Sequence, residues 1–230
     1  MSDTQDRLLR EEGFAFCGTI NASLSHEITN VFATINELAG LLDDFFVASQ
    51  QGTPLDVERL AGTTQRIAAQ VERGRRYVKR LNTFAHTVDD RQGAVRVNES
   101  VEAMVTLCGR LAKLRRVELE THLPETSPDV SGCPFDLQHI IFRCIDVLLT
   151  TSKEGDVVQV RVESEGARGR ITFEGGSPLD SGTDAASKHA FLNVLTRAYH
   201  CETEATIQPG QPVRLSVSLP HSLSGEGEKP

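Results

Sequence analysis

The chain has 230 residues, of which 39% are hydrophobic and 24% are charged, a composition typical of a globular protein with its own core. The formal net charge of -8 argues against nucleic acid as a partner, because phosphate binding requires a basic surface. No run of about 18 apolar residues occurs, and the N-terminal residues do not follow the pattern of a signal peptide. We therefore expect a cytoplasmic protein that neither crosses nor binds a membrane.

The first predicted helix carries apolar residues in alternating steps of four and three. The series is Leu24, Ile28, Val31, Ile35, Leu38, Leu42 and Phe45. A period of about 3.5 predicts a helix that packs along one stripe. Gly52 and Pro54 should end this helix, and Asp56 is a suitable N-cap for the next one.

A second helix repeats the pattern over a similar length. Its series is Leu60, Thr64, Ile67, Val71, Gly74, Val78, Leu81, Ala85 and Val88, with Thr64 and Gly74 as weak positions. The short turn between the helices predicts an antiparallel hairpin of two helices of about 30 to 35 residues each. A single hairpin buries only a narrow stripe, so we expect two copies to form a four-helix bundle in a homodimer.

From about Arg91 onward the period changes. The sequence predicts helices, strands and turns in this order: helix 97–113, strand 117–123, helix 135–151, strands 157–163 and 170–173, helix 185–200, and strands 204–208 and 213–219. The expected fold class is α+β, with one mixed sheet and helices on one face, in a small α/β sandwich. The predicted domains are the hairpin, 1–92, the α/β domain, 93–221, and a disordered tail, 222–230.

Cysteines give no sign of a disulfide or metal framework. Cys17, Cys108, Cys133, Cys144 and Cys201 are widely spaced, without a C-x-x-C pair or histidines at metal-ligand spacing. We expect small buried side chains in a reducing compartment.

His26 stands in the stretch S23-L-S-H-E-I-T-N30 of the first helix. It lies two residues from Leu24 and two from Ile28, which turns it away from the apolar stripe, and Asn30 follows about 40° around the helix. Glu27 is its neighbour in the chain. The spacing predicts a solvent-facing histidine, and the same helix face offers no second metal ligand.

This stretch resembles the phosphoacceptor motif of the dimerisation and histidine-phosphotransfer domain of sensor histidine kinases. There a helical histidine is followed by Glu and, after two variable residues, by Asn or Thr. The resemblance implies that His26 accepts a phosphoryl group, with Glu27 and Asn30 assisting. Val31 replaces the usual proline, which removes the expected cause of a helix kink. Glu27-x-x-Asn30 also resembles a phosphatase motif of these kinases, so this alternative stays open.

The order of elements after Arg91 is similar to the ATP-binding domain of the same kinases, but its nucleotide motifs are altered. Arg143 and Val147 stand where asparagines normally bind nucleotide and Mg²⁺. Glu174 and Pro178 replace an Asp and a Gly of the adenine loop, and the stretch 187–191 lacks the phosphate-loop glycines whose backbone N–H groups bind an anion. We therefore expect no ATP, no other cofactor and no metal of its own.

A histidine-bearing hairpin beside a degenerate ATPase-like domain resembles the dimeric bacterial histidine phosphotransferases of phosphorelays. The resemblance implies a transferase that relays a phosphoryl group between Asp residues of response-regulator receiver domains through His26, with Mg²⁺ supplied by the receiver. A hybrid kinase receiver is one candidate partner. Two alternatives remain: a receiver phosphatase, and a non-enzymatic pseudokinase scaffold or inhibitor.

A basic cluster lies in the second helix, in R73-G-R-R-Y-V-K-R80. Arg73, Arg76 and Arg80 recur at helical spacing, and antiparallel pairing should bring them toward the half of the first helix that holds His26. We expect them to bind the acidic pocket of a receiver. The alternative is a solvated flank, paired with Glu72 or with other acidic residues.

Overall fold

The computed structural model describes residues 3–89, 93–165, 168–176, 184–206, 212–220 and 223. The chain divides into two compact units. Asn21–Ala85 form the first, which we call the hairpin unit, and Met1–Ile20 together with His86–Pro230 form the second, which we call the α/β unit. The first twenty residues thus group with the later part of the chain, whereas the sequence assigned all of 1–92 to the hairpin.

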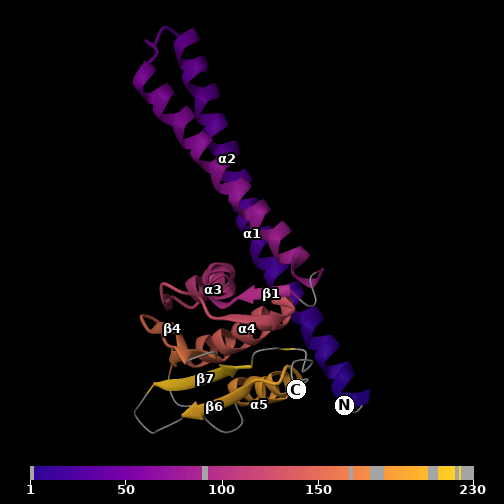
Figure 1. Ribbon diagram of the computed structural model, residues 1–230. Helices are drawn as coiled ribbons and strands as arrows, with labels where there is room; N and C mark the ends of the chain where they lie inside the picture. Colours follow the sequence, from indigo (N-terminus) through magenta and orange to yellow (C-terminus); the bar gives the residue numbers. More distant parts are fainter. Residues whose placement is uncertain are drawn as a thin grey trace. The chain divides into compact units, whose positions relative to one another are not determined.

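Two helices build the hairpin unit (Figure 1): α2 (Val57–Ala85) and the part of α1 (Asp3–Gln50) that follows Ile20. Between them, Gly52 takes a φ of +92°, which glycine adopts without strain. The Arg59 backbone N–H donates to Asp56 Oδ1 at 3.1 Å, so Asp56 caps α2 as predicted. α1 has 48 residues and is longer than expected, because its first turns belong to the α/β unit.

The predicted stripe of α1 is confirmed, whereas that of α2 is half wrong. Leu24, Val31 and Leu38 are buried, and the intervening stripe positions are half-buried. On α2 the inward series is Leu60, Thr63, Ile67, Gln70, Gly74, Tyr77, Leu81 and Phe84, and the predicted positions Thr64, Val71, Val78 and Ala85 are exposed. A seven-residue repeat leaves open which of two adjacent residues faces inward, and here Phe84 and Tyr77 bury more apolar surface than Ala85 and Val78 would.

Gly74 brings the two helices close together. A Cβ atom at this position would lie 3.2 Å from Val31 Cγ1, which is tighter than ordinary packing. The sequence treated Gly74 as a weak point of the stripe, but its missing side chain is what allows α1 and α2 to approach here.

The α/β unit contains a five-stranded sheet in the order β2-β4-β5-β7-β6. Its strands are β2 (Glu118–His122), β4 (Val157–Glu165), β5 (Arg168–Gly175), β6 (Glu202–Thr206) and β7 (Val213–Leu219). β2 runs parallel to β4 and the other pairs are antiparallel, so the predicted mixed sheet is confirmed. In β4 and β7 alternate residues are buried, which means that one face of the sheet is covered.

Three helices accompany this sheet: α3 (Val97–Leu114), α4 (Pro134–Thr151) and α5 (Asp184–Ala198). α3 and α4 contact the sheet, and α5 packs against α4 (Figure 1). α4 is buried along most of its length, including Ile140, Ile141, Cys144 and Ile145, and so forms the centre of the core.

A second sheet was missed from the sequence. β1 (Gly93–Arg96) pairs antiparallel with β3 (Asp129–Gly132), and the short 3-10 helix η1 (His86–Val88) precedes them. Strands of four residues are too short for an alternating pattern to stand out. Leu223 lies in the predicted disordered tail, yet it is buried and its N–H donates to the Ser131 carbonyl at 2.8 Å; the rest of that tail lies outside the described residues.

Candidate functional site

His26 lies on the exposed side of α1, as its spacing predicted. Asn30 follows one helical turn later, and its Nδ2 lies 3.0 Å from His26 Nδ1. In this orientation of the Asn30 amide, Nδ2–H donates to His26 Nδ1, and the ring proton is on Nε2. If the amide is turned over, Oδ1 takes the place of Nδ2 and accepts from Nδ1–H. The Nε2 atom then has a free lone pair. The orientation of the Asn30 amide is therefore coupled to which ring nitrogen of His26 carries the proton.

Glu27 is held from α2. The Tyr77 hydroxyl donates to Glu27 Oε2 at 2.8 Å, and Arg73 Nη2 donates to the same oxygen at 3.1 Å. The side chain of Glu27 retains only 18% of its exposure. Consecutive residues on a helix point about 100° apart. Glu27 therefore points toward α2, where its Oε2 is bonded, whereas His26 points to the exposed side of α1. Tyr77 was not predicted as a site residue, because the sequence repeat was interpreted with its neighbour Val78 facing inward.

The basic cluster of α2 is not a uniform stripe. Arg73 is paired with Glu27, and its hydrogen bond to Tyr77 is the main cause that raises the pKa of its guanidinium. The Arg80 guanidinium lies over the Tyr77 ring, 5.8 Å from its centre. Arg76 is exposed. Of the three arginines predicted to bind a partner, Arg76 and Arg80 present their charge outward and Arg73 holds an internal contact.

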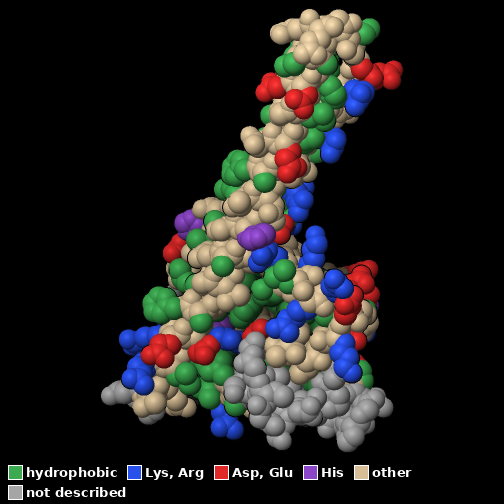
Figure 2. All heavy atoms as spheres, turned by 180° about the vertical axis from the view of Figure 1, so that it is seen from behind, with side chains coloured by type: hydrophobic (Ala, Val, Ile, Leu, Met, Phe, Trp, Pro, Cys, Tyr) green, Lys and Arg blue, Asp and Glu red, His purple; other side chains and the backbone are tan. Residues whose placement is uncertain are grey.

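An apolar groove of about 550 Å³ opens on the hairpin unit between α1 and α2. Ile28, Phe32, Ile35, Val71 and Val78 contribute to its lining. Phe32 is 66% exposed and Val78 55%, so large apolar side chains reach the surface, as the space-filling view of the hairpin also shows (Figure 2). Exposed apolar surface of this kind is typical of interaction sites.

In the α/β unit, the two positions at which the resemblance led us to expect asparagine are buried. Val147 is fully buried and Arg143 is 8% exposed. Arg143 forms an ion pair with Glu12 of α1, and its Nη1 lies 3.7 Å from Asp146. The chemistry at these positions is therefore an internal salt bridge and apolar packing.

An aromatic cluster fills the same face of α4. Phe16 from α1 stacks on the His139 ring with their centres 4.9 Å apart and their planes nearly parallel. Phe135 and Phe142 tilt against Phe16, and Phe191 of α5 tilts against His139. Burial, with a smaller contribution from the Arg143 charge, lowers the pKa of His139 to about 3, so this histidine is neutral at pH 7.

The other positions of the altered nucleotide motifs are only partly described. Glu174 accepts hydrogen bonds from Arg214 of β7 at 2.8 and 3.2 Å, so it braces two strands. Pro178 lies outside the described residues, as do the side chains of 187–189.

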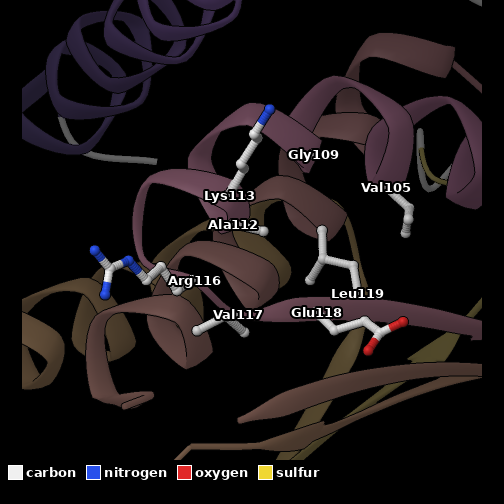
Figure 3. A pocket seen from close by; sticks show the side chains of 8 residues that line it. All are labelled: Val105, Gly109, Ala112, Lys113, Arg116, Val117, Glu118 and Leu119. Carbon is white, nitrogen blue, oxygen red and sulfur yellow. The ribbon is translucent and has the colours of Figure 1, made fainter. Parts of the chain in front are cut away.

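A pocket of about 650 Å³ lies between α3 and β2 (Figure 3). Its lining includes Val105 and Leu119 together with the charged residues Lys113, Arg116 and Glu118. Arg116 Nη1 lies 2.6 Å from Glu154 Oε1, so part of its charge is already neutralised. Charges of both signs and apolar side chains share this pocket.

The cysteines are free thiols: Cys108, Cys144 and Cys201 are buried, and Cys17 and Cys133 half-buried. Burial raises the pKa of Cys201 to about 12 and that of Cys108 and Cys144 further. Within the described part of the chain, no group of three His, Cys, Asp or Glu side chains could hold a metal ion. No helix of that part combines the length and the apolarity that a membrane crossing requires.

Comparison with known proteins finds similarity in structure alone, since no family model and no curated protein matches the chain. Full-length ShkA, solved in complex with AMPPNP, aligns with 85% of this chain and 45% of its own at 16% identity and a TM-score of 0.50. The catalytic domain of the histidine kinase ThkA aligns with 57% of this chain and 97% of its own, at 9% identity and a TM-score of 0.49. A histidine kinase from Burkholderia phymatum aligns with 83% of this chain and 97% of its own, at 13% identity and a TM-score of 0.48. Identities this low establish the fold alone: the chain has a histidine-kinase-like α+β fold.

Proposed function

We propose that the protein is a histidine phosphotransferase of a phosphorelay, which moves a phosphoryl group between Asp residues of response-regulator receiver domains through His26. The observation that carries this proposal is the exposed imidazole of His26 with Asn30 3.0 Å from its Nδ1. An imidazole nitrogen is a competent nucleophile near neutral pH when its other nitrogen is fixed by a partner.

The reaction needs few groups from this chain. The Nε2 lone pair of His26 attacks the phosphorus of a receiver's aspartyl phosphate, the P–O bond to that Asp breaks, and the carboxylate leaves. With the Asn30 amide turned over from the orientation in the structure, its Oδ1 accepts from Nδ1–H and so stabilises the positive charge that develops on the ring. The receiver's own Mg²⁺ neutralises the phosphoryl oxygens, and the reverse sequence delivers the group to a second receiver.

The α/β unit supports a source of phosphate other than ATP. Arg143 is tied to Glu12, Val147 is fully buried, and Phe16 with its aromatic neighbours packs against the same face of α4. Arg143 and Val147 offer no oxygen to Mg²⁺, which prefers carboxylate, amide and water oxygens, and the Glu12 carboxylate is paired with Arg143. We infer that the unit binds no nucleotide, and that titration with millimolar ATP will give no saturable signal.

The hairpin unit supports a homodimer and a docking surface for receivers. The groove lined by Phe32, Val71 and Val78 matches the face that a second hairpin would cover in a four-helix bundle. Val78→Asp would place a charge there and should convert dimers to monomers in sedimentation velocity. Arg76 and Arg80 carry the positive charge that complements an acidic receiver pocket.

A transfer experiment tests the proposal. Incubation with radiolabelled phosphorylated receiver domains should place acid-labile, base-stable label on the wild type and none on His26→Ala. His86→Ala is the matched control. His86 is also exposed and has a side-chain partner, since its Nδ1 lies 2.6 Å from Asp89 Oδ2, but it belongs to the α/β unit. A wild type that takes no label, or label that persists in His26→Ala, contradicts the proposal.

The second candidate is a receiver phosphatase, favoured by the polar amide of Asn30 one turn from His26. Such an amide can orient a water for attack on the receiver's aspartyl phosphate. In that case His26→Ala should still release free phosphate from the receiver, while Asn30→Ala should not. Binding of receivers without either reaction would instead indicate a scaffold.

A further inference from the structure

We propose that Tyr77 is a positioning residue which, together with Arg73, holds the Glu27 carboxylate so that a phosphoryl group on His26 is transferred to a receiver and not lost to water. This inference rests on the proposed function, because it requires a phosphorylated His26. It concerns the balance between transfer and hydrolysis at that site.

Three side chains form a closed set of hydrogen bonds. The Tyr77 hydroxyl donates to Glu27 Oε2 at 2.8 Å and accepts from Arg73 Nη2 and Nε at 3.1 and 3.2 Å. Arg73 Nη2 also lies 3.1 Å from Glu27 Oε2. Each bond involves at least one charged group, and such bonds are stronger than bonds between neutral groups. The hydroxyl is thus the common partner of the acid and the base.

The Tyr77 ring itself is fixed in place. It is half-buried in the inward series of α2, and the guanidinium groups of Arg73 and Arg80 lie 5.5 and 5.8 Å from its centre. A hydroxyl on a fixed ring costs little entropy to hold at one position, so it can restrain the more flexible Glu27 side chain.

The restraint matters because of where Glu27 stands in the chain. A carboxylate next to a phosphohistidine can act as a general base for hydrolysis. A water oxygen attacks phosphorus while the carboxylate takes one of the water protons, and the N–P bond breaks. The carboxylate then returns the proton to Nε2 of the leaving imidazole. The Glu27 side chain keeps 18% of its exposure and its Oε2 already accepts two hydrogen bonds. Held in this way it cannot turn toward a water at His26, and transfer is favoured.

The test measures how long the phosphoryl group survives on His26. The full-length protein is labelled with phosphoramidate, the excess reagent is removed, and loss of phosphohistidine is followed by ³¹P NMR. We expect Tyr77→Phe to shorten the lifetime about tenfold, a modest part of the effect of a well-placed general base. Arg73→Met should act in the same direction, which gives a second variant if Tyr77→Phe folds poorly.

A double variant separates positioning from a merely structural role. Tyr77→Phe combined with Glu27→Gln should recover the lifetime of Glu27→Gln alone, because the amide cannot serve as the base. Tyr199→Phe is the matched control: it deletes the hydroxyl of the other tyrosine, in the α/β unit, and should leave the lifetime unchanged.

The outcomes distinguish this inference from the function beneath it. Equal lifetimes of labelled wild type and Tyr77→Phe, or a short lifetime that persists in the double variant, overturn the role of Tyr77 and leave the phosphotransferase intact. A wild type that takes no label on His26 overturns the proposed function and this inference together.

Discussion

The two units of this chain treat their polar residues in opposite ways. In the hairpin unit, His26 and Asn30 are exposed and lie within hydrogen-bond distance of each other. In the α/β unit, His139 and Arg143 of α4 are both buried among aromatic rings. One unit leaves a histidine and an amide exposed, whereas the other buries a histidine and an arginine among packed side chains.

The difference shows that the chemical behaviour of a histidine is set by its surroundings and not by its residue type alone. His26 has a hydrogen-bond partner on one ring nitrogen and solvent around the ring, which suits nucleophilic attack. His139 stacks on Phe16 and its pKa is lowered to about 3, so it behaves as a flat, neutral filler of the core. The next experiments ask whether these two environments differ as strongly in energy as in geometry.

The largest expected effect is the loss of Phe16. This ring is fully buried against Phe135, His139 and Phe142, so Phe16→Ala should lower the free energy of unfolding by about 3–5 kcal/mol. Urea titration followed by circular dichroism measures the change. Phe14→Ala is the matched control, since Phe14 is 76% exposed and should cost little. Equal effects would mean that α1 does not pack on the α/β unit.

His139 should make the stability depend on acid. Its pKa is about 3 in the folded chain and near 6.5 in the unfolded chain. Between these two pH values the unfolded state binds the proton and the folded state does not, so the stability decreases as the pH is lowered. The loss approaches about 1.4 kcal/mol per pH unit for one proton until pH reaches about 3. His139→Phe should remove this part of the slope, whereas exposed His122→Gln should not. Identical slopes for all three proteins between pH 6 and 4 would refute the buried neutral form.

Much of the hairpin could be predicted from the sequence, and the reason lies in its period. Leu24, Val31 and Leu38 alternate with half-buried positions in steps of three and four, which places His26 on the opposite side without further information. On α2 the same rule failed at every second position, because a repeat does not say whether Tyr77 or Val78 faces inward. That choice depends on side-chain size across the interface, and it decided which residue meets Glu27.

The α/β unit shows a different limit. The positions of Arg143 and Val147 indicated that the usual nucleotide ligands are missing, but nothing in local sequence said what replaces them. The partners come from α1, more than a hundred residues away in the chain: Glu12 pairs with Arg143, and Phe16 covers His139. Such long-range contacts leave no periodic signature, so the sequence assigned these residues to the hairpin.

A smaller effect is expected where the two helices of the hairpin come closest. Gly74→Val would place its Cβ 3.2 Å from Val31 Cγ1, and forcing the helices apart should cost about 1–3 kcal/mol. Gly62→Val is the matched control in the same helix, because no atom lies within 4 Å of its added Cβ. Thermal unfolding of the two variants should therefore differ, with Gly74→Val the lower; the reverse order would show that Gly74 does not set the spacing.

The smallest effect should come from the exposed ion pair of Arg116 and Glu154, whose side chains are 71% and 66% exposed. Water screens such a pair, and holding two long side chains in one geometry costs entropy, so Arg116→Ala should change stability by about 0–1 kcal/mol. Raising the salt concentration should reduce even that difference. Comparison with Arg143→Ala gives the contrast: Arg143 is buried with Glu12 and Asp146, and its removal leaves carboxylates without their cation. If both variants lost equal stability, burial would not determine how much an arginine ion pair contributes to the free energy of unfolding.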